Sequence, residues 1–166
     1  MAGRQLFYTL DGPAADLSLA EGLVLERFHP TVSSLRPADM PEPPPLPLQL
    51  FWHLFSRQSY EIYLVRAGCA IVHTSHVITK NPKFAFMGPS DVEIGPCWTD
   101  KAYRGRGIYP AVLSRIARDR SGKRLWMFCD EDNSSSRKGI ERAGFSFAGA
   151  GGKKRGIYRI EETAPR

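Results

Sequence analysis

Apolar and polar positions at the start of the chain alternate in ways that predict one strand, two helices and a loop. Residues 4–10 have the character of a strand. Residues 16–28 place apolar side chains about one helical turn apart, which predicts a helix; they are Leu17, Ala20, Val24 and Phe28. Residues 37–47 are too rich in proline for a helix or a central strand, so we expect a surface loop. A short apolar helix is predicted at 48–55.

The middle of the chain is rich in the residues that favour strands. Residues 61–65 and 69–78 are separated by Arg66-Ala67-Gly68, a short turn that predicts a hairpin. Two further strands are expected at 84–87 and 91–99, on either side of the turn Gly88-Pro89-Ser90.

The last third of the chain mixes helical and strand patterns. Ile108, Val112 and Ile116 share one face of an amphipathic helix predicted over 107–120. The elements expected after it are a strand at 124–129, a helix at 133–143 that Gly144 ends, and paired strands at 145–148 and 156–160. Together these elements predict an α+β domain with a mostly antiparallel central sheet flanked by helices.

Length and composition are those of one ordinary globular domain. The chain has 166 residues, of which 42% are hydrophobic and 24% charged, enough for a sizeable core. No apolar stretch reaches the length of a membrane span. Carboxylates interrupt the first thirty residues, unlike a signal peptide, so a cytoplasmic location is expected. The three cysteines form neither a disulfide framework nor a zinc pattern.

The net charge of +6 suggests an anionic ligand. Because no nucleic-acid-binding motif accompanies the charge, a small polyanion fits better than a duplex. The candidate site is the stretch Arg104-Gly105-Arg106-Gly107, which lies between a predicted strand and a predicted helix. Glycines let the backbone approach an anion closely, and the first turn of a helix offers unpaired N–H groups. The stretch lacks the Lys-Ser/Thr of a P-loop, and Pro110 stands where a dinucleotide fingerprint needs glycine.

The stretch 104–109 resembles the pyrophosphate-binding signature of the GNAT superfamily of acyl-CoA-dependent N-acetyltransferases, Arg/Gln-x-x-Gly-x-Gly/Ala, with Tyr109 at the last position. A second match follows in Asn133-x-x-Ser136 and then Ala143-Gly144-Phe145. The resemblance covers about 61–160 and implies a single GNAT-like domain over 1–166. In such a domain 61–160 would be the acetyl-CoA-binding core, and 1–60 would supply acceptor-side elements.

The resemblance implies a set of residues that bind acetyl-CoA: Cys97, Trp98, Thr99, Arg104, Gly105, Arg106, Gly107, Ile108, Tyr109, Asn133, Ser136 and Arg137. Simpler interpretations remain open for some of them. Trp98 is equally well explained as core, Asn133 as the cap of a helix, and Arg137 as part of a solvated helix face.

The family transfers its acyl group by direct attack of an amine in a ternary complex. Glu93 and Asp91, two apart on a strand and so on one face, are the candidate bases, with a surface role as the alternative. The position of the family's usual tyrosine acid holds Ile140, which leaves water or Tyr109 as proton donor. His73 and His76 should face opposite sides of their strand, so no metal is expected.

The sequence therefore predicts transfer of an acetyl group from acetyl-CoA to a primary amine, most simply that of a small molecule. A non-catalytic acyl-CoA-binding or sensing module is the alternative, favoured by Ile140. The partners expected are acetyl-CoA and the amine, with neither nucleic acid nor a membrane, and a homodimer stays open.

Overall fold

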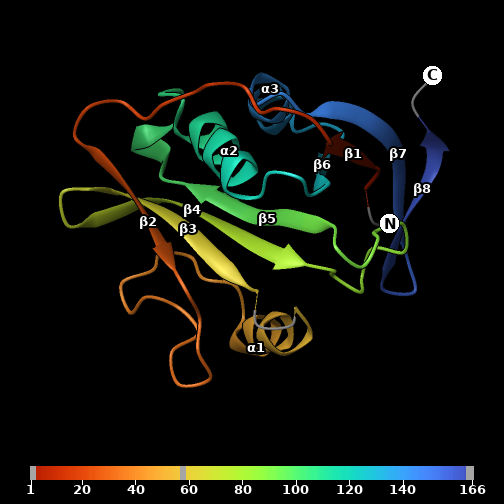
Figure 1. The fold of residues 1–166 in the computed structure, drawn as a ribbon, viewed down its shortest axis with the longest axis horizontal. Helices are drawn as coiled ribbons and strands as arrows, with labels where there is room; N and C mark the ends of the chain where they lie inside the picture. Colours follow the sequence, from red (N-terminus) through yellow and green to blue (C-terminus); the bar gives the residue numbers. More distant parts are fainter. Residues whose placement is uncertain (1–2, 57–58, 164–166) are drawn as a thin grey trace.

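The computed structural model describes residues 3–56 and 59–163. These form a single eight-stranded sheet with the order β2-β3-β4-β5-β6-β1-β7-β8 (Figure 1). The strands are β1 (Gln5–Leu10), β2 (Leu23–Phe28), β3 (Glu61–Ala67), β4 (Ala70–Thr79), β5 (Val92–Thr99), β6 (Leu125–Asp130), β7 (Ser146–Lys154) and β8 (Ile157–Thr163). The helices are α1 (Leu46–Phe55), the 3-10 turn η1 (Lys101–Tyr103), α2 (Ile108–Asp119) and α3 (Ser134–Arg142). The predicted α+β class with a mostly antiparallel sheet is confirmed.

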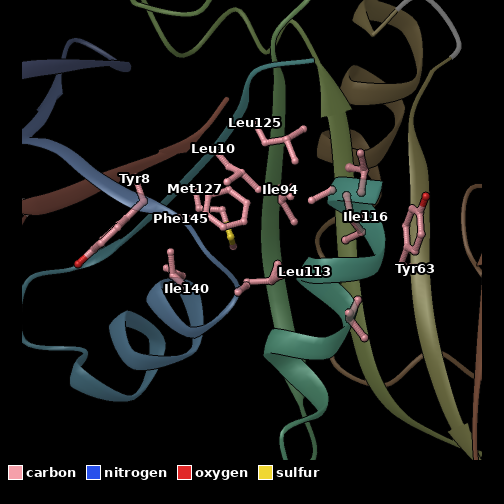
Figure 2. Close-up of a cluster of buried hydrophobic side chains, with 14 of the residues drawn as sticks. Tyr8, Leu10, Tyr63, Ile94, Leu113, Ile116, Leu125, Met127, Ile140 and Phe145 are labelled. Carbon is pink, nitrogen blue, oxygen red and sulfur yellow. The ribbon is translucent and has the colours of Figure 1, made fainter. Parts of the chain in front are cut away.

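Helices cover both faces of the sheet. Helices α2 and α3 pack on one face, where their apolar side chains meet those of the strands in the main core (Figure 2). In that core Leu113 and Ile116 of α2 and Ile140 of α3 are completely buried. Helix α1 lies on the opposite face, with Trp52 against Tyr60 and Ile62 in a second, smaller core. None of the helices within the described ranges is both long and apolar enough to cross a membrane.

The helix predicted over 16–28 is wrong. The structure has irregular backbone through Ala20, a turn at Gly22 with φ of 80°, and then strand β2, which pairs antiparallel with β3. The apolar residues Leu23 and Leu25 recur with the period of a strand and pack against the main core. The helical spacing that included Leu17 and Ala20 was therefore coincidental, because partners on β3 decide the conformation of Leu23–Phe28.

Three smaller predictions also need correction. Residues 84–87 form no strand, since only a bridge from Phe84 to Tyr158 is present there. Helix α1 begins at Leu46, inside the expected loop, because prolines at the first turn of a helix cost no hydrogen bond. Residues 145–148 do not pair with the last strand, whose partners on β7 are Gly149 to Lys154. The elements predicted at 61–78, 107–120, 124–129 and 133–143 are present with boundaries shifted by a few residues.

The parallel pair β5 and β6 separates after a short contact. Only Val92 and Glu93 of β5 pair with β6, although β5 continues to Thr99 and β6 to Asp130. Beyond that point β5 stays paired with β4, and β6 stays paired with β1. The sheet therefore opens between the second halves of these two strands, and this opening faces the start of α2.

Candidate functional site

The opening between β5 and β6 is a pocket of about 680 Å³. One wall is β5 from Ile94 to Thr99, and the other is β6 from Met127 to Asp130. The pocket extends to the turn before α2 and to the first turns of α3. It brings together most of the predicted acetyl-CoA-binding residues, namely Cys97, Trp98, Thr99, Arg104, Gly105, Gly107, Ile108, Tyr109, Asn133 and Ser136.

The turn between β5 and α2 presents backbone N–H groups to this pocket. Gly105 and Gly107 have φ of 77° and 75°, the left-handed region that side chains with a Cβ rarely adopt. Among the described residues, the N–H groups from Gly105 to Tyr109 have no backbone acceptor. These N–H groups, with the positive end of the α2 dipole, form a concave donor surface suited to a phosphate group.

Basic side chains surround the same end of the pocket. Arg104, Lys138 and Arg142 line it, while Asp130 is the acidic residue of the lining. The Arg104 guanidinium donates a hydrogen bond of 3.0 Å to the carbonyl oxygen of Thr99, which holds it across the turn. The predominance of positive charge here favours an anionic ligand.

Two of the predicted acetyl-CoA-binding residues lie outside the pocket lining. Arg106 is exposed, and its guanidinium carbon lies 4.8 Å from the centre of the Tyr103 ring. Arg137 faces Tyr8, whose hydroxyl raises the pKa of this guanidinium. Both side chains have protein partners, so their placement favours a structural role over direct contact with a ligand.

Tyr109 fills the space between α2 and α3. Its ring lies so close to Gly139 that a Cβ added there would be 2.5 Å from the ring carbon Cδ1. Its hydroxyl lies 3.4 Å from the Ser136 Oγ, and burial raises its pKa well above the ordinary value. Gly139 therefore makes room for a large side chain at a position where the GNAT signature has Gly or Ala.

The first turn of α3 borders the pocket through Asn133 and Ser136. The Asn133 side-chain oxygen accepts a hydrogen bond of 3.0 Å from the Ser136 N–H, so Asn133 caps the helix as one interpretation expected. The two residues also line the pocket, and the Asn133 side-chain nitrogen is a separate donor beside it. Both interpretations of Asn133 are thus compatible with its placement.

Glu93 lies just behind the pocket wall. Its side chain is buried, and the Asn81 amide donates a hydrogen bond to Glu93 Oε2. Burial raises the pKa of this carboxyl to about 8, an effect that Asn81 and Lys83 partly oppose. A Cβ added at Gly95, which lines the pocket, would be 4.0 Å from Glu93 Oε1. A carboxyl with this pKa can accept and release a proton near neutral pH.

Asp91 is held by structural hydrogen bonds. Its Oδ2 accepts a bond of 2.8 Å from the Trp126 indole N–H and one of 2.9 Å from the Gly88 N–H. These bonds close the turn before β5 and fix an indole ring, and Asp91 does not line the pocket. Asp91 and Glu93 are both buried, so the surface role that was the alternative is wrong for both. The hydrogen bonds of Asp91 give it a structural role instead.

Ile140 belongs to α3 and is completely buried in the main core. The position cannot supply a proton. The hydroxyl and thiol groups that do line the pocket belong to Thr99, Tyr103, Tyr109, Ser135, Ser136, Tyr158, Cys97 and Cys129.

Sequence reasoning missed a polar cluster behind β5. His73 and Ser75 of β4 lie opposite Thr99 and Cys97 of β5, and their side chains are joined by hydrogen bonds. The sequence predicted only that His73 and His76 face opposite ways, which the contacts of His73 with Tyr109 and of His76 with Trp52 confirm. The register between β4 and β5 was the missing information, and no local signal reveals it.

Other residues of the pocket come from the ends of the chain. Gln5 of β1 and Tyr158 of β8 line it, as does Phe128 of β6. Nothing in their local sequence marks them as site residues, because the sheet order alone places β1 beside β6. Within residues 3–56 and 59–163, no group of three or more His, Cys, Asp or Glu is arranged to hold a metal ion.

Comparison with known proteins gives a likeness of fold. No protein-family model and no curated protein matches the chain. Among solved structures, a GCN5-related N-acetyltransferase from Sphaerobacter thermophilus is 18% identical, with a TM-score of 0.60 over 90% of this chain and 50% of that one. A GNAT-family acetyltransferase from Colwellia psychrerythraea is 16% identical, with a TM-score of 0.61 over 88% of this chain and 53% of that one.

A tandem GNAT protein from the clavulanic acid biosynthesis pathway is 16% identical and covers 99% of this chain, with a TM-score of 0.54. The chain spans about half of the length of these three solved structures, namely 50%, 53% and 55%. The chain has the fold of the GNAT acetyltransferases, as the resemblance predicted.

Proposed function

We propose that this protein is a GNAT-type N-acetyltransferase that transfers an acetyl group from acetyl-CoA to a primary amine. The observation that carries the proposal is the pocket between β5 and β6, which ends at unpaired N–H groups from Gly105 to Tyr109. A long ligand with amides in its middle and phosphates at one end matches both parts of this pocket. Coenzyme A has this composition.

The residues present fit such a ligand. Backbone N–H groups at 105–109 would bind the pyrophosphate, and Arg104, Lys138 and Arg142 would balance its charge. The edge of β5 that β6 leaves unpaired, at Cys97 to Thr99, would hydrogen-bond the pantetheine amides as an added strand does. A backbone N–H near Trp98 or Thr99 would stabilise the oxyanion that forms during attack. Bound acetyl-CoA supplies the activated acetyl group.

Glu93 is the proposed base. An amine must lose a proton before it attacks, and a carboxyl with a pKa of about 8 accepts protons efficiently near neutral pH. Because Glu93 lies behind Gly95 rather than in the pocket lining, it would act through a water molecule. Asp91 is the weaker candidate, since Trp126 and Gly88 already bind its Oδ2.

The specific alternative is a protein that binds acyl-CoA without transferring the acyl group. The buried Ile140 favours it, because the residue leaves the family's usual acid position without a proton donor. Tyr109 is the hydroxyl that the sequence nominated as a substitute, and its hydroxyl lies 3.4 Å from the Ser136 Oγ. Enzyme and binding module predict the same affinity for acetyl-CoA and differ in turnover.

Isothermal titration with acetyl-CoA tests the first part, with dephospho-CoA and ATP as controls. Selective binding of acetyl-CoA supports the cofactor site. Absence of binding by folded protein overturns the whole proposal. The second part is tested by coenzyme A release in the presence of a panel of amines, including amino acids, polyamines, amino sugars and peptides. Binding without acceptor-dependent release would favour the non-catalytic alternative.

A further inference from the structure

A continuous chain of side-chain hydrogen bonds joins the neighbouring strands β4 and β5, next to the pocket wall that β5 forms. The Thr99 Oγ1 lies 2.7 Å from His73 Nδ1, and His73 Nε2 lies 2.8 Å from the Ser75 Oγ. The Ser75 hydroxyl in turn donates a bond of 3.1 Å to the Cys97 sulfur. Four polar side chains on two neighbouring strands are thus joined end to end.

Both ends of this chain of hydrogen bonds reach the pocket and its middle does not. Thr99 and Cys97 line the pocket, whereas His73 and Ser75 of β4 are completely buried and do not line it. The His73 ring also lies against Tyr109, with ring centres 6.0 Å apart. The chain of hydrogen bonds therefore connects two points of one pocket by a route that is closed to solvent.

The hydrogen bonds have a consistent direction. Because Ser75 donates to the Cys97 sulfur, the Ser75 oxygen is free to accept from His73 Nε2–H. A neutral imidazole carries one N–H, so His73 Nδ1 accepts from the Thr99 hydroxyl. Burial keeps the imidazole neutral by lowering its pKa to about 3. Every donor then points toward Cys97, which lines the pocket and whose own S–H is left free to donate.

We propose that Thr99, His73, Ser75 and Cys97 form a proton relay that delivers a proton from water in the pocket to the sulfur of coenzyme A as it leaves. The proposal rests on the proposed acetyltransferase function and names the proton donor that Ile140 does not provide. Cys97 is the catalytic residue in it, and Ser75 and His73 are positioning residues that act through Cys97.

The proton and electron balance of this step is closed. When the carbon–sulfur bond of the thioester breaks, its electron pair passes to the coenzyme A sulfur, and the Cys97 S–H gives that sulfur its proton. Cys97 receives a proton from Ser75, Ser75 from His73 Nε2, and His73 Nδ1 from Thr99. Thr99 receives its proton from water, and the proton lost by the attacking amine neutralises the hydroxide that remains.

A nucleophilic role fits Cys97 less well than a proton-donating role. Burial raises the pKa of this thiol to about 12, with Ser75 opposing and Glu93 adding to the rise. A nucleophile needs the thiolate, whereas a relay needs the proton to stay on sulfur. Cys129 lines the opposite wall of the same pocket, where its pKa is also raised by burial.

The test measures the acidity of the bound coenzyme A thiol, which needs neither an acceptor nor turnover. Coenzyme A is titrated with pH while bound to the protein, and thiolate is detected by its ultraviolet absorbance against a matched sample with desulfo-coenzyme A. A donor aimed at the thiolate lowers its pKa. Cys97→Ala should raise the pKa of the bound thiol by about one unit, the effect of one hydrogen bond to a charged atom.

The other groups near the pocket are the same in every variant. The charged ones are Asp130, Arg104, Lys138 and Arg142, and the hydroxyl and thiol groups include those of Tyr109, Tyr158 and Cys129. Glu93, behind the pocket wall, has its pKa raised by burial to about 8 and so loses its proton near that pH. All act on the bound thiol in the wild-type protein and in each variant alike. A difference between variants therefore reports the substituted side chain, and Cys97→Ser controls for the loss of the electrostatic contact between position 97 and Glu93.

Three further variants complete the experiment. Cys97→Ser keeps a donor and should restore the wild-type value, and Ser75→Ala should raise the pKa less than Cys97→Ala does. If Ser75→Ala does not fold, the pair at Cys97 still decides the question. Cys69→Ala, at an exposed thiol in the turn between β3 and β4, should leave the value unchanged.

The outcomes separate the two proposals. If wild-type protein does not bind coenzyme A, the proposed function falls and the relay falls with it. If coenzyme A binds but its thiol has the same pKa in wild type and Cys97→Ala, the relay is overturned and the cofactor site stands. An acetyl group found on Cys97 by intact-protein mass spectrometry after incubation with acetyl-CoA would also overturn the relay, because it would show a nucleophile.

Discussion

Tyr109 and Gly139 form a matched pair across two helices. Each residue looks unfavourable by itself, since a tyrosine replaces a small residue of the GNAT signature and a glycine interrupts a helix. Each residue explains the other, because a Cβ at position 139 would lie 2.5 Å from the Tyr109 ring and only glycine leaves room for it. The stability of α3 is therefore reduced in order to accommodate the tyrosine.

The pair predicts a change of sign in a double-mutant cycle. Gly139→Ala should lower the free energy of unfolding by about 1 kcal/mol or more, because overpacking outweighs the helical preference for alanine. In the background of Tyr109→Ala, the same change should raise the free energy by about 0.5 to 1 kcal/mol. Urea unfolding of the four proteins measures both effects. Equal effects in both backgrounds would show that the two side chains do not compete for space.

Glu93 predicts a pH-dependent stability. Its pKa rises from 4.5 in the unfolded chain to about 8 in the folded protein, so the folded state binds the proton more tightly. The stability that this proton provides is complete below about pH 4.5 and is lost as the pH rises through 8. Wild-type protein should therefore lose stability between pH 5 and 8 more steeply than Glu93→Gln, by about 1 kcal/mol per pH unit.

Urea unfolding at a series of pH values measures the two slopes. Glu21→Gln, at an exposed carboxylate, is the control and should follow the wild-type curve. Parallel curves for wild type and Glu93→Gln would mean that the Glu93 carboxyl titrates normally, and its proposed role as a base at neutral pH would lose its support.

The chemistry of single residues was only partly predictable. Glycines, arginines and Asn133 carry a local signal, because motif spacing and the order of strand and helix are both visible in the sequence. His73 and Ser75 carry no local signal, because their hydrogen bonds depend on lying opposite Thr99 and Cys97 in an antiparallel pair of strands. That register follows from which faces are buried over the whole sheet.

At the scale of elements, the helices that pack on the main core were the most predictable. Helix α2 is amphipathic through its whole length and has a glycine before its first residue, so pattern and cap agree. The first strand, β1, was predicted over 4–10 and is present at Gln5–Leu10, whereas β2 was harder to predict. Strand β2 is a short edge strand with exposed side chains, among them Val24, and only its pairing with β3 makes it a strand. The separation of β5 from β6 has no sequence signal that we recognise.

The turn between β5 and α2 gives a prediction for that element. Gly107→Val should abolish binding of acetyl-CoA, because a β-branched residue at φ of 75° forces the backbone to move and misaligns the N–H groups. The strain should cost about 1 to 3 kcal/mol of stability, which leaves the domain folded. Isothermal titration and circular dichroism measure the two effects.

Gly122→Val is the matched control for this strain. Gly122 has φ of 80° in the turn after α2, has no neighbour within 4 Å of an added Cβ, and does not line the pocket. It should lose similar stability and keep its affinity. Wild-type affinity in Gly107→Val would place the phosphate site elsewhere, while loss of affinity in both variants would indicate a general effect of destabilisation.

At the scale of the whole molecule, positive side chains gather at the pocket between β5 and β6. The net charge is +6, and the charged side chains that line the pocket are three cations and one carboxylate: Arg104, Lys138, Arg142 and Asp130. Many of the remaining arginines pair with carboxylates on the surface, as Arg66 does with Glu26 and Asp39. Positive charge that can attract an anionic ligand is therefore concentrated at the pocket, near the positive end of the α2 dipole.

This concentration predicts a selective and salt-dependent stabilisation by acetyl-CoA. A ligand at one hundred times its dissociation constant adds about 2.7 kcal/mol to stability, which for a domain of this size raises the melting temperature by about 5 to 10 °C. Because phosphates supply much of the attraction, the rise should shrink as ionic strength increases and should be smaller for dephospho-CoA at equal concentration.

Thermal unfolding with each ligand at low and high salt measures these differences, and a DNA oligonucleotide of equal phosphate concentration serves as the comparison. A rise with acetyl-CoA that is lost in Gly107→Val and kept in Gly122→Val would tie the stabilisation to the turn before α2. An equal rise with the oligonucleotide would mean that the basic surface binds phosphates without regard to their carrier. In that case the pocket between β5 and β6 would not be what selects the ligand, and nucleic acid would replace coenzyme A as the partner to pursue.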